Sequence, residues 1–188
     1  MNFTRTTVDT KNININSKDI TSVTVSTDSP ATVNKSRVSK TEIKLATVDE
    51  MLAEASILFE EHYIEIARNK HLMVLKPDEE TYRKSEEMGS IFILSARQDN
   101  VLIGYSVNFV SNHLLYADLK LAQNDLLFIS KEHRGGRVGL KLIKETEKHA
   151  TSLGCKLMLW HAKENTTLAA MLPRLKYGVQ DIMFSKEL

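Results

Sequence analysis

The 188-residue chain lacks most of the features that mark secreted, membrane and metal-binding proteins. It has a single cysteine, Cys155, and no apolar run approaches the ~20 residues that a membrane span needs. The N-terminus has no hydrophobic core of the kind found in signal peptides. The histidines are scattered, and no group of His, Cys and carboxylates has the spacing of metal ligands. We therefore expect a cytoplasmic protein that binds no membrane and no metal.

An excess of charge of one sign is also missing. Lys and Arg together number 25 and Asp and Glu number 24, so the formal net charge is +1. A chain without a global basic field does not attract nucleic acid or anionic lipid over its whole surface. We expect no nucleic-acid partner, and any charged ligand must be bound by a local cluster.

Residues 1–40 have too few apolar residues to build a core. Ser, Thr and Asn make up about half of this segment, and Phe3 is its only aromatic residue. This composition predicts a disordered tail followed by one domain over residues 41–188. Alternating β-branched residues in the tail leave a second interpretation open, a weak strand that docks on the domain or on a partner.

Hydrophobic periodicity predicts the elements of the domain. The first half is expected to hold a strand, one long helix or two with a break, a second helix, and two strands of a hairpin joined by a polar turn. In order, these cover residues 42–45, 48–66, 77–88, 90–96 and 101–110, with the turn at residues 97–100.

The second half is expected to alternate strands and helices. A polar segment interpreted as a loop over one end of the sheet is followed by a strand, an amphipathic helix, a parallel strand, a short helix capped by Asn165 and bent or stopped by Pro173, and a last strand. The loop covers residues 112–124, and the strands cover residues 125–130, 156–161 and 182–185. Gly154 ends the amphipathic helix, and Asn165 begins the short one.

The segment LLFISKEHRGGRVG, residues 126–139, is the most informative part of the chain. An apolar strand leads into a loop with Gly135, Gly136 and Gly139, flanked by Arg134 and Arg137, and a helix begins at once. Free backbone N–H groups of the loop and of the helix start can converge on one anion, such as a phosphate or pyrophosphate. An ordinary strand-to-helix turn with solvated arginines is the alternative.

Two other phosphate-binding motifs fit this segment poorly. A nucleoside triphosphate loop needs Gly-x-x-x-x-Gly-Lys-Ser/Thr, and the sequence at Gly139-Leu140-Lys141 has neither that spacing nor the hydroxyl that binds magnesium. A dinucleotide fingerprint needs Gly-x-Gly-x-x-Gly early in a strand–helix–strand unit, whereas this loop stands late in the chain. ATP and NAD are therefore poor candidates.

The order of elements over residues 41–188 resembles the GNAT superfamily of acetyl-CoA-dependent N-acetyltransferases, most specifically from residue 126 onward. The family loop reads Arg/Gln-x-x-Gly-x-Gly/Ala; Arg134 takes its first position and Gly139 its last, while Arg137 replaces the middle glycine. The resemblance implies a mixed, mostly antiparallel central sheet flanked by helices, with a parallel strand–helix–strand unit around the loop. The segments IARNK, SVNF, HLLY and NDLLFI also look like acetyltransferases encoded by bacteriophages, whose place of action would be the host cytoplasm.

The resemblance also implies where acetyl-CoA would bind. Its pyrophosphate would lie on the glycine loop, its pantetheine would pair with the main chain of the preceding strand between two splayed strands, and Asn165 would reach the pantetheine. The cofactor-binding residues are then Phe128, Ile129, Ser130, Arg134, Gly135, Gly136, Arg137, Val138, Gly139 and Asn165. The same Asn165 can equally be a plain helix cap.

Transfer of an acetyl group to an amine needs a base for the amine proton and benefits from an acid for the leaving thiolate. Asp125, Glu65 and His113 are the candidate bases, in that order, and each can also be an ordinary solvated residue. Many family members use a tyrosine as the acid, but that position falls on Leu172, so Tyr177 or solvent would have to serve.

These observations favour an acetyltransferase that uses acetyl-CoA and an unidentified amine acceptor, a small molecule or a protein, by direct transfer. A rival hypothesis is a catalytically weak acyl-CoA-binding or protein-interaction module on the same fold, tethered by its N-terminal tail. A protein partner for the tail and a homodimer are further hypotheses.

Overall fold

The structure, a computed structural model, describes residues 40–188. The predicted tail over residues 1–40 therefore lies, apart from Lys40, outside the described residues. Five strands, five α-helices and one 3-10 turn make up the described part. In chain order they are β1 (Thr41–Ala46), α1 (Val48–Glu54), α2 (Ser56–Ile66), α3 (Glu79–Glu87), β2 (Ile91–Gln98), β3 (Val101–Asn112), β4 (Lys120–Ile129), η1 (Lys131–His133), α4 (Val138–Ser152), β5 (Leu157–Trp160) and α5 (Thr167–Arg174).

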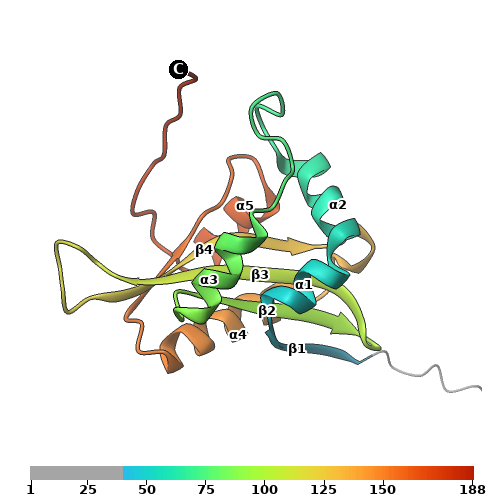
Figure 1. The fold of residues 1–188 in the computed structure, drawn as a ribbon, viewed down its shortest axis with the longest axis horizontal. Coiled ribbons are helices and arrows are strands. Elements are labelled where there is room, and N and C mark those ends of the chain that lie inside the picture. Colours follow the sequence, from blue (N-terminus) through green and yellow to red (C-terminus); the bar gives the residue numbers. More distant parts are fainter. Residues whose placement is uncertain (1–39) are drawn as a thin grey trace, which may run out of the picture. The chain divides into compact units, whose positions relative to one another are not determined.

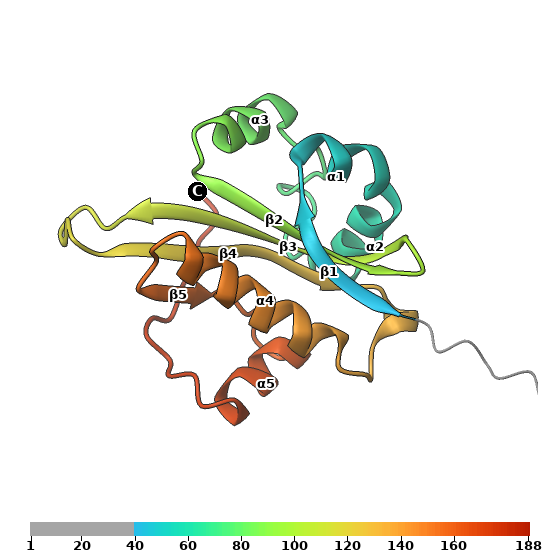
Figure 2. The same cartoon turned by 90° about the horizontal axis from the view of Figure 1, so that it is seen from below.

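The five strands form one sheet in the order β1-β2-β3-β4-β5 (Figure 1). The first four pair antiparallel, and β5 pairs parallel to β4. Helices α1, α2 and α3 cover one face, and α4 and α5 lie on the other (Figure 2). This arrangement confirms the predicted mixed fold with its parallel strand–helix–strand unit. None of the described helices is long and apolar enough to cross a membrane.

Local sequence signals explain the helix boundaries. Thr47 and Glu50 form a reciprocal capping box at the start of α1, so two of the orphan N–H groups there are satisfied. The helical pattern of residues 48–66 is interrupted at Ala55, which confirms the interpretation as two helices. Asp78 caps α3 through the N–H of Thr81, and Gly89 beyond its end has a φ of 63°.

The core has two parts, one on each face of the sheet. The alternation of side chains along each strand produces this division, because successive residues point to opposite faces. Under α1 and α2 the buried side chains include Val48, Met51, Leu58, Tyr105, Val107 and Phe128. Against α4 they include Phe92, Leu94, Ile103, Ile129, Leu142 and Ala150.

Two predicted boundaries in the hairpins were wrong. Arg97 and Gln98 belong to β2, and the turn is only Asp99 and Asn100, both with positive φ, as a two-residue hairpin turn requires. Arg97 was mistaken for a turn residue because it is charged. It is 8% exposed and its Nη1 lies 2.7 Å from Oε2 of Glu54, which satisfies the charge.

The polar segment 112–124, predicted as a loop, is strand at both ends. β3 extends to Asn112 and β4 begins at Lys120, so only residues 113–119 connect them. The polar residue Asn124 was misleading here, because its side-chain amide is buried in the sheet and donates to Oδ1 of Asn108.

The predicted last strand over residues 182–185 is wrong. Residues 175–188 belong to no helix or strand, and the sheet of the described residues ends at β5. Ile182, Met183 and Phe184 are exposed, so their alternation reflects no packed face.

The close pairing of β3 with β4 at Gly104 gives a test of the fold. A Cβ at this position would lie 2.3 Å from Cδ1 of Ile129 and 2.5 Å from the carbonyl oxygen of Phe128. We predict that Gly104→Ala lowers the free energy of unfolding by about 2 kcal/mol, because the strands must move apart. Chemical denaturation measures the change. Gly178→Ala is the control, because Gly178 has open space around it and should shift the value by less than about 0.5 kcal/mol; equal stability of both variants would contradict this packing.

Candidate active site

β4 and β5 separate beyond their first four paired residues. Leu121 to Asn124 pair with Leu157 to Trp160, after which β5 ends while β4 continues to Ile129. Along this last half, β4 keeps β3 as its neighbour on one side, and no strand from residues 40–188 lies on the other. Its backbone groups on that side are therefore available to an extended ligand.

A bulge lies at the point where the strands separate. Val107 pairs with Leu126 and Asn108 pairs with Asn124, so Asp125 is left without a partner on β3. The Asn124 side-chain amide holds the bulge by donating to Oδ1 of Asn108 at 2.9 Å, to the Leu126 carbonyl at 3.0 Å and to the Val107 carbonyl at 3.2 Å. The extra residue changes the direction in which the strand presents its side chains.

The bulge is also connected to the helix beneath it. Oγ1 of Thr146, on α4, donates to Oγ of Ser106 at 3.1 Å, and Ser106 lies 3.3 Å from Nδ2 of Asn124. All of these side chains are buried. Oδ1 of Asn124 is buried without a partner in the described part of the chain.

β4 leads directly into the glycine loop. η1 follows Ser130, Gly135 has a φ of 84°, and α4 begins at Val138. The N–H groups of residues 135–137 find no protein acceptor among residues 40–188, and the first N–H groups of α4 have none within the helix. A Cβ at Gly136 or Gly139 would meet no atom within 4 Å, so the loop faces open space. These free donors fit a pyrophosphate.

The Arg134 side chain points across to α2. Its Nη1 and Nη2 bind the two carboxylate oxygens of Glu65 at 2.7 and 2.8 Å, and its Nε donates to the Ile129 carbonyl at 2.7 Å. The guanidinium also lies 5.1 Å from the centre of the Phe128 ring. For Arg134 to contact a phosphate, its ion pair with Glu65 would have to open, or one of its N–H groups would have to bind both partners. The contact with a phosphate stays a prediction.

The same ion pair affects the second predicted base. The hydrogen bonds from Arg134 lower the pKa of Glu65, which makes its carboxylate a weaker proton acceptor. Glu65 is therefore placed to hold Arg134 more than to take a proton.

The C-terminal end of α2 spans the gap between the separated strands. On one side Glu65 binds Arg134, at the end of β4. On the other side, Nζ of Lys163 donates to the Ile66 carbonyl at 2.7 Å, and Nη2 of Arg68 donates to the Glu164 carbonyl at 3.0 Å. Both strands are thus fastened to one helix end.

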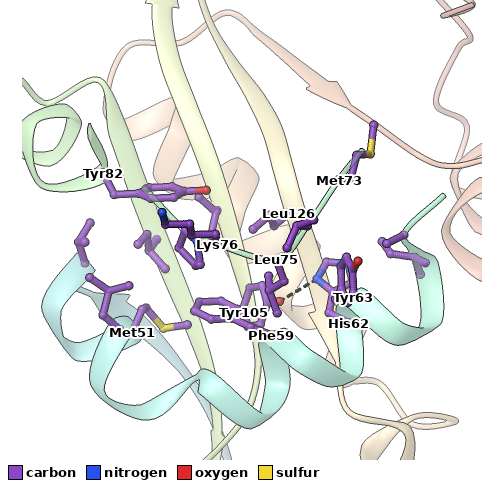
Figure 3. Close-up of a pocket in the computed structure, with 18 of the residues that line it drawn as sticks. Met51, Phe59, His62, Tyr63, Met73, Leu75, Lys76, Tyr82, Tyr105 and Leu126 are labelled. Atoms are coloured by element: carbon purple, nitrogen blue, oxygen red, sulfur yellow. Dashed lines mark hydrogen bonds between the residues drawn. The ribbon is translucent and has the colours of Figure 1, made fainter. Parts of the chain in front are cut away.

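A pocket of about 330 Å³ lies beneath α1, α2 and the segment that connects α2 to α3. Its walls come from helices, from that segment and from the sheet (Figure 3). The residues that line it are mainly apolar and aromatic, and include Met51, Phe59, Met73, Leu75, Tyr82 and Leu126. Leu126 follows the bulge directly, so the pocket reaches the point where β4 leaves β5.

His62 and Tyr105 form a buried pair in the wall of this pocket. Nδ1 of His62 lies 2.7 Å from the Tyr105 hydroxyl (Figure 3). The imidazole also stacks on the Phe128 ring, with 4.7 Å between the ring centres. Burial, with a smaller effect of the Lys163 charge, lowers the pKa of His62 to about 4. The imidazole is therefore neutral at pH 7. The sequence placed His62 on the apolar face of its helix but gave no sign of its partner.

Asp125 lies near the rim of the pocket. Its side chain reaches solvent, yet the surrounding protein raises the pKa of its carboxyl by burial, which the His161 charge partly opposes. Burial raises the pKa of Tyr82, which lines the pocket, and the nearby Asp125 charge adds to that shift. Asp125 is thus the predicted base that the fold brings to both the bulge and the pocket.

The Tyr177 hydroxyl is bound to Glu147, on α4. Oε1 of Glu147 also accepts from Nε1 of Trp160 at 3.3 Å, at the last paired residue of β5. Burial and the Glu147 hydrogen bond raise the pKa of Tyr177, so its hydroxyl stays protonated. Leu172 is buried in α5 and brings no hydroxyl to this region.

The last two predicted residues lie outside helices and strands, as expected for His113, whereas Asn165 is not the helix cap that was predicted. Asn165 has a φ of 63° and precedes the cap; Thr166 is the cap of α5, and its hydroxyl accepts from the Ala169 N–H at 3.3 Å. Asn tolerates this left-handed conformation better than most residues do. His113 lies in the β3–β4 connection, where its Nδ1 accepts from the N–H groups of Leu115 and Tyr116.

Comparison with known proteins gives this geometry a family. Residues 56–177 match the sequence model of the acetyltransferase (GNAT) family. The match includes both separated strands, the glycine loop and α2. No curated protein sequence matches the chain.

Solved structures share the fold. A ribosomal-protein-alanine N-acetyltransferase from Brucella melitensis biovar Abortus 2308 is 16% identical, with 79% of this chain and 99% of that chain covered and a TM-score of 0.60. An aminoglycoside acetyltransferase from an uncultured soil metagenomic sample is 18% identical, with 79% and 96% covered and a TM-score of 0.62. Glucosamine-6-phosphate N-acetyltransferase from Arabidopsis thaliana is 15% identical, with 79% and 98% covered and a TM-score of 0.58. Identities this low show the fold alone.

The buried imidazole predicts a pH dependence of stability. The pKa of His62 is about 4 in the folded chain, against an ordinary value of 6.5, so the unfolded chain binds more protons between these values. Stability should therefore fall as pH falls through this window, by about 2 kcal/mol between pH 7 and pH 4.5 from this group. His62→Gln, which can still accept from Tyr105, should remove that part of the slope. Denaturation of both proteins at several pH values checks the prediction, and identical slopes would contradict it.

Proposed function

The chain belongs to the acetyltransferase (GNAT) family, and on this basis we propose that it transfers an acetyl group from acetyl-CoA to an amine acceptor. The observation that carries the proposal is the continuity of three features along one strand: the bulge at Asp125, the unpaired edge up to Ile129, and the open glycine loop beyond it. This run offers backbone partners for an extended ligand that ends in a pyrophosphate.

The glycine loop is the proposed pyrophosphate site. The free N–H groups of residues 135–137 and the start of α4 supply donors, and the helix dipole adds a modest attraction of about 0.3–1 kcal/mol for an anion. Arg137 stands at the start of α4 without a side-chain cap bond, so its guanidinium is available to a phosphate. Phe128 and Ile129 would pair through their main chain with the amides of the ligand. The predicted pairing of Ser130 would compete with bonds that its main chain already makes, from its N–H to the Ile103 carbonyl and from the His133 N–H to its carbonyl.

The net reaction joins the amine nitrogen to the acetyl carbon as the carbon–sulfur bond breaks. Acetyl-CoA supplies the activated acyl group and the leaving thiol. The amine gives up one proton and the thiolate gains one, so the reaction needs no oxidant or metal. What the protein must supply is orientation and a path for these protons.

We assign the base to Asp125. Its carboxyl lies at the bulge, where the pocket meets the separated strands, and burial raises its pKa toward the range of an effective base. Glu65 is less suited, because Arg134 lowers the pKa of its carboxyl. His113 would have to leave the N–H groups that it binds in the β3–β4 connection.

The proton for the leaving thiolate has two proposed sources. Tyr177 is protonated and sits with Glu147 and Trp160, near the last pair of β4 and β5. Solvent is the other, since a thiol is a tolerable leaving group. Leu172 favours a second candidate function, a catalytically weak acyl-CoA-binding module, because a buried leucine stands where the family places a tyrosine.

Other expectations remain proposals of the same kind. These are binding of acetyl-CoA through Asn165, action in the cytoplasm, a phage-type origin, a protein partner for residues 1–40, and a homodimer.

The loop assignment predicts that Gly136→Asp abolishes binding of CoA. A carboxylate here would repel the pyrophosphate, and the position has open space, so the fold should be kept. Gly136→Ala is the matched control, because it adds a Cβ without charge and should bind CoA within a few-fold of the original chain. Calorimetric titration with CoA measures both. If the Asp variant binds CoA normally, the loop is only a turn.

The base assignment predicts that Asp125→Asn keeps CoA affinity and lowers turnover by roughly 10²–10⁴-fold near neutral pH. The amide is nearly isosteric, so a loss confined to turnover reports the proton transfer. Asp118→Asn, in the β3–β4 connection, is the control and should leave turnover unchanged. Release of free CoA with an amine panel gives the rates. Tight binding of acetyl-CoA without release from any amine would favour the binding module instead.

A further inference from the structure

We propose that the acceptor is a small primary amine carried by an apolar body, and that the pocket beneath α1 and α2 binds this body. The inference rests on the proposed function and specifies its second substrate. The pocket, at about 330 Å³, lies in the size range of small-molecule sites and opens beside the bulge at Asp125.

The walls of the pocket are mainly apolar. The helices contribute side chains such as Met51 and Phe59, the sheet contributes Ile93 and Val107, and β4 contributes Leu126. An apolar group bound here would leave water at a gain of about 0.8 kcal/mol per buried methylene. A sugar would instead bury hydroxyl groups without partners, which is unfavourable.

The charged residues of the pocket also favour an acceptor with an apolar body. None of its lining residues is Asp or Glu, so a polycationic acceptor would find no carboxylate on the walls. Several polar groups that do line it already have partners: Tyr105 is bound to His62, and Lys163 to the Ile66 carbonyl. Lys76 and Lys163 both carry positive charge at the walls and repel an acceptor with several ammonium groups.

The segment between α2 and α3 supplies an apolar cover. Met73, Val74 and Leu75 are 57%, 72% and 40% exposed, a run of large apolar side chains in contact with water. All three line the pocket, and Figure 3 labels Met73 and Leu75. An apolar acceptor would cover part of this surface, whereas a polar acceptor would leave it exposed.

The amine end has a defined place. Leu126 forms the pocket wall next to the bulge, and Asp125 is close enough to Tyr82 to contribute to the rise in the pKa of its hydroxyl. A carboxylate at this rim attracts the ammonium group and leaves the apolar body in the pocket. The nitrogen is then nearest to the bulge, where β4 and β5 separate.

Rates with matched amines test the proposal. The original chain would be assayed with acetyl-CoA and n-butylamine, n-hexylamine, 2-phenylethylamine, the polar analogue 2-(2-aminoethoxy)ethanol, glucosamine 6-phosphate and kanamycin. Two added methylenes should raise kcat/KM by roughly tenfold from butylamine to hexylamine. The polar analogue, of nearly the same length, should be at least tenfold poorer than hexylamine.

Variants of the connecting segment locate the effect. Leu75→Ser should lower kcat/KM for hexylamine by several-fold and reduce the ratio of hexylamine to butylamine, because Leu75 lines the pocket. Leu72→Ser is the matched control: it changes the same residue type in the same segment, and Leu72 does not line the pocket. Affinity for CoA should be unchanged in both.

Direct binding separates this inference from the proposed function. Calorimetry with CoA alone, and with hexylamine or its polar analogue in the presence of CoA, accompanies the rates. Preference for the polar amines, or equal loss in both variants, overturns the apolar acceptor and leaves the acetyltransferase standing. Tight CoA binding and selective hexylamine binding without transfer overturn the activity but keep the pocket assignment. Absence of hexylamine binding and of hexylamine transfer overturns the inference.

Discussion

The separation of β4 from β5 beyond Asn124 is the constraint on which the candidate site depends. A strand that loses one neighbour must have its backbone groups satisfied by something else, and a ligand in extended form can do this. The separation begins where the Asn124 amide holds a bulge in place through three carbonyl-type oxygens. The local geometry of the bulge therefore depends on one buried side chain.

The end of α2 turns this separation into a defined opening. Glu65 fastens it to Arg134 after β4, while the Ile66 carbonyl fastens it to Lys163 after β5. Each contact is partly exposed and is worth little alone. Together they fix the distance between the two strand ends on the face that carries the pocket. The glycine loop lies one residue beyond Arg134, so the anion site and the pocket share the same support.

Much of this arrangement follows from local sequence, and the remainder depends on distant partners. The glycine loop and the unit from β4 to β5 were predictable, because their signals lie within consecutive residues. The bulge was not, since Asn124 looks like a loop residue until Asn108 pairs with it. The neutral state of His62 depends on its burial, and the side chains that it packs against, Tyr105 and Phe128, are distant in sequence. The last predicted strand failed because alternation alone provides no partner.

The apolar pocket would also lower the pKa of the bound ammonium group, which makes it easier for a base to deprotonate. Burial disfavours the charged form of any group, and the described residues show this in both directions: it lowers the pKa of His62 and raises that of Asp125. An ammonium group drawn from water to the edge of the same pocket is subject to the same effect, and each unit by which its pKa falls is worth about 1.4 kcal/mol toward the neutral amine. A site rich in carboxylates would stabilise the ammonium and oppose this change. Apolar walls with one carboxylate at the rim would therefore both bind the proposed apolar amine and favour its deprotonation.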